Sequence, residues 1–140
     1  MNFYEVAVKY CRQTGEDNPG TVKEHYLVEA LSPADAEKRV IEEIKPFVFN
    51  SECEFTSIKK RRFFDIVSGD KNDDTYYACK VELIKIDGDQ ELRKAVSILV
   101  HDSYLIHAAQ RLNEHLNTYD ADIISVSKSP ILDIFRATNP

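Results

Sequence analysis

The chain has 140 residues and carries 24 acidic against 18 basic side chains, which gives a formal net charge of −6 at pH 7. This balance excludes a general nucleic-acid binder, whose basic surface must neutralise phosphates, and no stretch approaches the ~20 apolar residues of a membrane-spanning helix. Three cysteines without CxxC spacing exclude a disulfide framework, so we expect a soluble protein of the reducing cytoplasm.

The first predicted elements form a β-hairpin. Residues Phe3 to Cys11 alternate apolar and polar side chains, as a half-buried strand does. Segment 12–21, RQTGEDNPGT, is rich in turn-forming residues and predicts the connecting loop. Thr21 to Leu31 then predicts the returning strand.

A helix is predicted to follow directly. Ser32 fits the N-cap, Pro33 the first helical position, and Asp35 the reciprocal carboxylate of a capping box. Pro46 is predicted to end the helix. The stripe to be buried consists of residues spaced by four, Ala36, Val40 and Ile44.

The strand after this helix is predicted to break. In one continuous strand from Thr56 to Ile66, Lys60 and Arg62 would share the core-facing side, at a prohibitive desolvation cost. The sequence therefore predicts two short strands joined by a kink. The polar residues 69–75, GDKNDDT, predict a linker.

The second half repeats this order. The stretch Leu27 to Ile44 recurs at Leu99 to Leu116, at an offset of 72. The matching identities are Leu27, Val28, Ala36, Arg39 and Glu42 with Leu99, Val100, Ala108, Arg111 and Glu114. We therefore predict an α+β fold of tandem duplicated ββαβ units, mostly antiparallel sheet packed by two helices around a pseudo-twofold axis. Residues 1–140 form a single duplicated domain, with repeats 1–68 and 76–137 and the linker 69–75 between them.

The elements of the second repeat follow the same signals. Tyr76 to Ile86 and Leu92 to Val100 predict a hairpin that turns around Gly88. Asp102 or Ser103 is expected to cap the helix. Its apolar stripe is predicted to comprise Leu105, Ala108, Ala109, Leu112 and Leu116. Like the first repeat, the second is predicted to end in a kinked strand, with Pro130 at the kink.

A basic cluster stands out in this acidic chain: Lys59, Lys60, Arg61 and Arg62, followed by Phe63. Arginine beside aromatic side chains engages phosphates and stacks on bases, so the cluster is the predicted ligand-binding site. The alternative is a solvated strand edge that its charges keep from aggregating.

Tyrosines crowd both predicted hairpins: Tyr4, Tyr10, Tyr26, Tyr76 and Tyr77. Most are expected to be core residues whose hydroxyls reach the edge of the sheet. The alternative is a tyrosine-lined groove at the seam between the repeats, where a ligand or partner would bind.

The histidines and cysteines predict neither a metal site nor a catalytic residue. No histidine lies in an HExxH motif or beside a ligand-like cysteine. His107, Arg111 and His115 are spaced by four and predict a polar helix face, and His101 beside Asp102 predicts a cap or turn. The three cysteines, Cys11, Cys53 and Cys79, lack the helix N-terminus or histidine that activates a thiol. No cofactor motif is present. An enzyme that uses His101 or His107 as a base remains the alternative.

Four stretches resemble a known family: YLVEALSPADAEKRVIEEIKPF, FTSIKK, TYYACKVELI and SPILDIF. Together they resemble an uncharacterised family of short proteins from Bacteroidetes and their phages, a domain of unknown function (family 4494). The resemblance covers nearly the whole chain. It implies a bacterial or phage-infected cytoplasm, and it implies no activity.

We therefore expect a non-enzymatic binding module that holds an anionic ligand, whether nucleotide, nucleic acid or acidic protein, at the basic kink. It is expected to be a homodimer without a membrane partner. One alternative is a structural or virion-associated protein whose strands pair edge to edge. Another is a phage anti-defence protein that sequesters a nucleotide signal.

Overall fold

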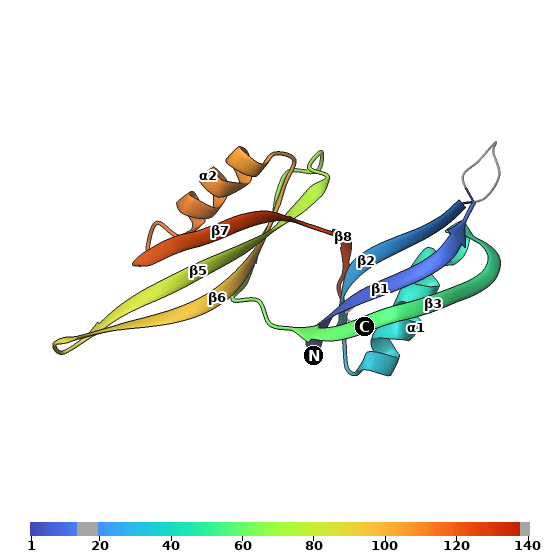
Figure 1. Cartoon of the computed structure of the whole chain (residues 1–140), viewed down its shortest axis with the longest axis horizontal. Coiled ribbons are helices and arrows are strands. Elements are labelled where there is room, and N and C mark those ends of the chain that lie inside the picture. The colour runs from blue at the N-terminus through green and yellow to red at the C-terminus, as the bar shows by residue number, and fades with distance from the viewer. Residues whose placement is uncertain (14–19, 138–140) are drawn as a thin grey trace. The chain divides into compact units, whose positions relative to one another are not determined.

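A computed structural model describes residues 1–13 and 20–137 of the chain (Figure 1). The fold is α+β, with two four-stranded, mostly antiparallel sheets and two α-helices in the described part. The chain divides into two compact units. Unit 1 comprises Met1–Arg62 and Pro130–Pro140, and unit 2 comprises Phe63–Ser129.

Unit 1 contains a sheet of order β3-β1-β2-β8 and the helix α1. Its elements are β1 (Asn2–Arg12), β2 (Gly20–Ala30), α1 (Pro33–Ile44), a 3-10 turn η1 (Lys45–Phe47), β3 (Val48–Arg61) and β8 (Ile131–Phe135). Strand β1 is antiparallel to both β2 and β3, and β8 runs parallel to β2. The first hairpin is thereby confirmed, and residues 14–19 of its predicted loop lie outside the described residues.

Unit 2 has the corresponding order, β4-β6-β5-β7, and the helix α2. Its elements are β4 (Asp65–Val67), β5 (Thr75–Asp87), β6 (Gln90–Asp102), α2 (Leu105–His115) and β7 (Ala121–Ser129). The predicted turn is confirmed, with Gly88 at φ 64°, a conformation that glycine adopts without strain. Neither α1 nor α2, the helices of the described chain, is long and apolar enough to cross a membrane.

The fourth strand of each sheet comes from the other half of the chain. Strand β4 follows β3 after a break at residues 62–64, yet it pairs with β6 in unit 2. Strand β8 follows β7 after Pro130, yet it pairs with β2 in unit 1, where Figure 1 shows it beside β2. Both predicted breaks are confirmed. The predicted repeats 1–68 and 76–137 do not coincide with the units, because the two short strands are exchanged; the duplication itself stays a prediction.

Helix α1 packs its predicted stripe on the sheet of unit 1. Ala36, Val40 and Ile44 are buried against core-facing residues of β1 and β2. The Ser32 hydroxyl accepts a hydrogen bond from the Asp35 amide at 3.1 Å. In return, the Asp35 carboxylate accepts from the amide of Leu31 at 2.9 Å, one residue before the position that a standard capping box uses. The helix ends at Ile44, and Pro46 lies in the 3-10 turn η1 that follows.

Helix α2 buries a narrower stripe than predicted. Ala108, Leu112 and Leu116 are buried with Tyr77, Cys79, Val81, Ile98 and Val100 of the sheet. Leu105 is 48% exposed, because it lies in the first turn of the helix. The predicted caps were wrong. Tyr104 is the N-cap and makes no side-chain cap bond, while Asp102 accepts the amides of Ser103 and Tyr104 just before the helix begins.

Candidate functional site

The predicted basic cluster lies at the end of an edge strand. We call Lys59, Lys60, Arg61 and Arg62 the basic segment. Its first three residues close β3, and Arg62 begins the break before β4. Strand β3 pairs with β1 on one side and is the outermost strand of its sheet. The other edge of β3 therefore has no strand partner among the described residues.

Arg61 is held within unit 1. Its Nη1 lies 2.5 Å from Oε1 of Glu5 on β1, and Oε2 of the same carboxylate lies 3.7 Å from Nδ1 of His25 on β2. The Glu5 carboxylate therefore compensates the charge of Arg61. The contact between the two side chains fastens the end of β3 to β1.

The other three cations of the basic segment are uncompensated. Lys59, Lys60 and Arg62 are exposed, and none of their side chains forms an ion pair or hydrogen bond with a described residue. Lys59 lies opposite Glu5 in the register, and Lys60 lies opposite the core residue Tyr4. Successive side chains of a strand point to opposite faces, so the two lysines lie on either side of the sheet edge.

Two aromatic residues follow the basic segment. Phe63 is half-buried, while Phe64 is 42% exposed and lies edge-on to Tyr119, with ring centroids 5.6 Å apart. The Phe64 amide donates to the carbonyl of Ser97 at 2.8 Å. This hydrogen bond lies within unit 2, which begins at Phe63, directly after the basic segment.

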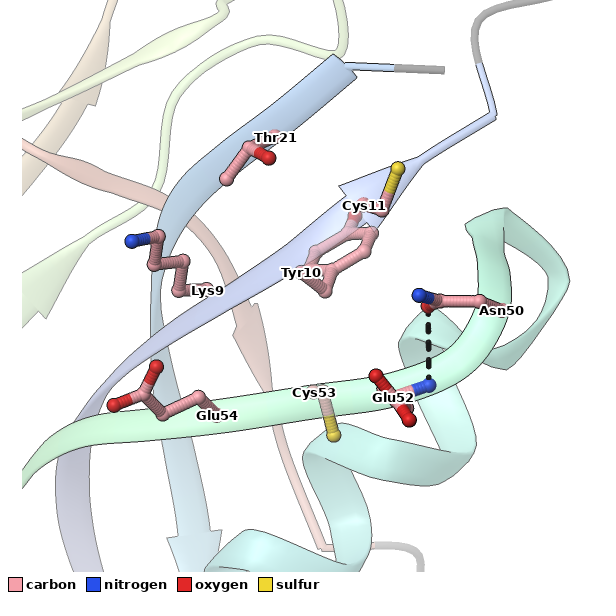
Figure 2. A pocket seen from close by; sticks show the side chains of 8 residues that line it. All are labelled: Lys9, Tyr10, Cys11, Thr21, Asn50, Glu52, Cys53 and Glu54. Carbon is pink, nitrogen blue, oxygen red and sulfur yellow. Dashed lines mark hydrogen bonds between the residues drawn. The ribbon is translucent and has the colours of Figure 1, made fainter.

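A shallow pocket of about 600 Å³ lies at the opposite end of β3. Between Tyr10 and Arg12 the register of β1 slips, because Tyr10 faces Cys53 but Arg12 faces Val48. Across this register shift β3 has more residues than β1, so β3 bulges, and the pocket lies beside the bulge (Figure 2). Its lining residues are Lys9, Tyr10, Cys11, Thr21, Asn50, Glu52, Cys53 and Glu54.

The pocket combines side chains of mixed charge with two thiols. Within this bulge, Oδ1 of Asn50 accepts a hydrogen bond from the Glu52 amide at 3.3 Å, which is the dashed line of Figure 2. The thiol groups of Cys11 and Cys53 point in different directions in that view. Burial, and the charge of Glu37, raise the pKa of Cys53, which disfavours the thiolate that nucleophilic chemistry requires.

The five predicted tyrosines are divided between the two units. Tyr4, Tyr10 and Tyr26 belong to the core of unit 1. Tyr77 belongs to the core of unit 2, and Tyr76 stacks on His101 with ring centroids 4.4 Å apart. Each therefore has a packing role within its own unit, and the ligand-binding seam stays a prediction.

Two of these tyrosines converge on a carboxylate that the sequence analysis missed. Glu24 on β2 accepts the hydroxyls of Tyr10 at 2.5 Å and of Tyr26 at 2.8 Å, and Nη1 of Arg12 at 3.0 Å. Burial, followed by the hydrogen bond to Glu24, raises the pKa of Tyr10 to about 12, and the same causes raise the pKa of Tyr26. The available signal was the position of Glu24, which shares the core-facing side of β2 with Tyr26.

The polar face of α2 carries a row of side chains that contact carboxylates. Nδ1 of His107 lies 2.9 Å from Oδ2 of Asp102, and Nε of Arg111 lies 3.0 Å from the same oxygen. One turn on, Nε2 of His115 lies 2.6 Å from Oδ2 of Asp65 on β4. The sequence predicted the polar face but not its partners on the strands.

Asp102 is the centre of this network, and its side chain is only 1% exposed. Burial alone would raise its pKa, but hydrogen bonds from the Ser103 amide, His107 and Arg111 outweigh burial and lower the pKa to about 2. Asp102 and His107 form one part of a general-base site, a carboxylate that orients an imidazole. The hydroxyl nearest along the chain, that of Ser103, does not bond to His107; it donates to Asp73 Oδ1 at 3.0 Å. The network therefore joins the end of β6 to α2 and to the loop before β5.

No cluster of three side chains suited to a metal ion occurs in the described part of the chain.

A family model described as "Domain of unknown function (DUF4494)" matches residues 2–137. No curated protein matches the chain.

Proposed function

Since the chain belongs to a family of domains of unknown function (DUF4494), we propose its function from its own side chains: it is a non-enzymatic binding module that holds an anionic partner at the basic segment. The observation that carries the proposal is the set of three exposed, uncompensated cations, Lys59, Lys60 and Arg62, in a chain of net charge −6. No ion pair with the described chain accounts for this clustering of like charges, which repel one another.

The geometry favours an extended acidic segment of a protein over a compact phosphate. Lys59 and Lys60 lie on opposite faces of β3, so they do not converge on one small anion. An extended peptide that adds to the outer edge of β3 would present side chains to both faces alternately, and acidic residues there would meet both lysines. The partner is thus an acidic segment in β-conformation.

We place this activity in the cytoplasm of a bacterium of the Bacteroidetes or of a phage-infected cell, as the sequence resemblance implies. A nucleotide-sequestering phage protein would use the same cations, and nucleotide binding is therefore measured alongside the acidic peptide.

A second candidate is assembly between copies of this chain. The observation in its favour is the length of β3, whose 14 residues present an unpaired edge in the described structure. In that case Lys59 and Lys60 would restrict edge pairing by charge repulsion instead of recognising a ligand. Sedimentation separates the two functions, because removal of the charges would promote self-association.

The test replaces only the uncompensated cations. The variant Lys59→Glu with Lys60→Glu and Arg62→Glu leaves Arg61 and its bond to Glu5 in place. The matched control changes three exposed, unpaired lysines of unit 2, Lys71→Glu, Lys80→Glu and Lys94→Glu, and so alters the net charge equally. Wild-type and control proteins are expected to bind a polyglutamate peptide, whereas the variant binds at least about tenfold more weakly, or 1.4 kcal/mol.

Three results contradict the proposal. Equal binding of polyglutamate by variant and control shows that the basic segment has no such role. Binding of ATP or oligothymidylate in place of polyglutamate assigns the cations to a nucleotide or nucleic acid. Self-association of the neutral variant Lys59→Gln, Lys60→Gln, Arg62→Gln, with no loss of peptide binding, assigns them to protection of the edge.

A further inference from the structure

Two residues at corresponding places in the units differ in chemistry. Ala30 is the last residue of β2 and lies opposite Asn2 at the start of β1. Asp102 is the last residue of β6 and lies opposite Thr75 at the start of β5. Both side chains are 1% exposed. Unit 1 therefore has a methyl group where unit 2 has a buried carboxylate.

The arginines that follow also correspond. Arg39 and Arg111 each lie three residues after the buried alanine of their helix, Ala36 or Ala108. In unit 2, Nε of Arg111 donates to Asp102, and its Nη1 and Nη2 reach the Ser68 carbonyl at 3.2 Å and Asp73 at 3.4 Å. The guanidinium of unit 2 is thus bound on each of its nitrogens.

Arg39 lacks this set of partners. Its Nη2 pairs with Glu43 at 3.0 Å, one turn along α1. Its Nε is buried and has no hydrogen-bond partner. A buried donor without a partner is unfavourable and is rare in folded proteins. Ala30 offers no acceptor to this Nε at the position where Asp102 accepts from Arg111 in unit 2.

A cavity of about 340 Å³ adjoins this arginine. The charged residues of its lining are Glu29, Asp35, Lys38, Arg39 and Glu42, all in unit 1. Two of the acids are already engaged, since Glu29 accepts the amide of Ala137 and Asp35 that of Leu31. Lys38 and Glu42 are exposed and make no ion pair with a described residue.

We propose that this cavity binds a small ligand whose carboxylate pairs with the guanidinium of Arg39, to which unit 1 offers no buried carboxylate such as Asp102. Arg39 lines the cavity with a side chain that is 28% exposed, and Glu43 contacts only Nη2, so Nη1 keeps its N–H donors. A charge-assisted hydrogen bond from Nη1 holds the carboxylate, and Lys38 adds a second positive charge.

The rim of the cavity restricts the ligand further. Glu42 is an unpaired carboxylate on the same lining, and Glu29 and Asp35 add negative charge around it. A plain dianion would be repelled by these groups, whereas an ammonium group on the ligand would be attracted. The ligand class is therefore an amino acid or a compound of similar size that carries both a carboxylate and an ammonium group. This site shares no residue with the basic segment and does not depend on the function proposed for it.

The test titrates the standard L-amino acids, each against its carboxamide, into the full chain by calorimetry. At least one amino acid is expected to bind, while its carboxamide, which lacks the carboxylate, binds at least about tenfold more weakly. Arg39→Gln is expected to abolish binding. Glu43→Gln is the matched control, because it breaks the same ion pair but leaves the guanidinium, and it is expected to keep binding.

Ala30→Asp provides a second, independent test. It places a carboxylate where unit 2 has Asp102, so the variant is expected to fold, to compensate the charge of the Arg39 guanidinium from within, and so to lose the ligand. Ala30→Ser, which adds a small neutral side chain, is expected to retain it. The proposal is overturned if no amino acid binds, if the carboxamide binds equally well, or if Arg39→Gln binds as the wild type does.

Discussion

Nε2 of His115 on α2 lies 2.6 Å from Oδ2 of Asp65 on β4. This contact fastens a helix of the second half of the chain to a three-residue strand that comes from the first half. Arg111 extends the attachment, because its Nη1 donates to the carbonyl of Ser68, just after β4. The polar face of α2 thereby holds the exchanged strand in unit 2.

The change Asp65→Ala tests this attachment. Because both side chains are partly exposed, the loss of the pair is expected to lower the free energy of unfolding by only about 0.5–1 kcal/mol. Urea denaturation measures the change. Glu114→Ala removes an exposed neighbouring carboxylate from α2 and is expected to have a smaller effect, so equal effects of the two changes would contradict the attachment.

Gly69 lies where the loop after β4 approaches β6. A Cβ atom at this position would overlap the backbone carbonyl of His101 and the carboxylate of Asp73. Since backbone cannot move aside cheaply, Gly69→Ala is expected to destabilise the protein by about 1–3 kcal/mol, measured by thermal denaturation. At Gly20 a Cβ would meet nothing within 4 Å. Gly20→Ala is therefore the control, and similar losses at both positions would contradict the close approach.

Asp102 is expected to govern stability in acid. Its pKa in the folded protein is about 2, below its ordinary value of 3.8, so its stabilising contribution is complete above pH 3.8 and is lost as the pH falls towards 2. Asp102→Asn is expected to lower stability at neutral pH and to flatten the decline between pH 3.8 and 2. Melting temperatures measured across this range test the prediction, with the exposed Asp89→Asn as the control. An unchanged acid profile would show that Asp102 is not the responsible group.

Tyr10 is expected to act at the opposite end of the pH scale. Its pKa rises from 10.0 to about 12 on folding, so its hydroxyl stabilises the fold fully below pH 10 and this contribution disappears as the pH rises towards 12. Tyr10→Phe removes the ionising hydroxyl and is expected to flatten the alkaline decline in melting temperature. Tyr104→Phe alters a 73% exposed tyrosine and is expected to leave the decline as in the wild type. Alkaline profiles that do not differ between the two variants would exclude Tyr10.

The hairpins and helices were predictable because their signals are local. Alternation along β1 and the Ser32 cap of α1 depend on neighbouring residues only. The exchange of β4 and β8 was not predictable, because strands of three and five residues carry too little pattern to identify a partner. Each pairs in parallel with a strand that is distant in the sequence, β4 with β6 and β8 with β2.

The predicted ligand-binding role of the basic segment stays a prediction. Lys59 and Lys60 were expected to be exposed at a kink, but they lie within β3 before the break, and they are exposed at the outermost strand of the sheet. The neutralisation of Arg61 by Glu5 depends on a contact between residues 56 positions apart. That Nε of Arg39 is buried without a hydrogen-bond partner could not be predicted from the sequence. It depends on the residue at the end of the neighbouring strand, which is Ala30 in unit 1 and Asp102 in unit 2.

Hydrogen exchange along β3 tests the central claim most directly. If an acidic segment adds to the outer edge of β3, polyglutamate is expected to slow exchange of amides within Val48–Arg61, most strongly near Lys59 and Lys60, and to leave the Lys59→Glu, Lys60→Glu, Arg62→Glu variant unaffected. Unchanged exchange in β3 at saturating peptide, or equal protection in the variant, would contradict the claim.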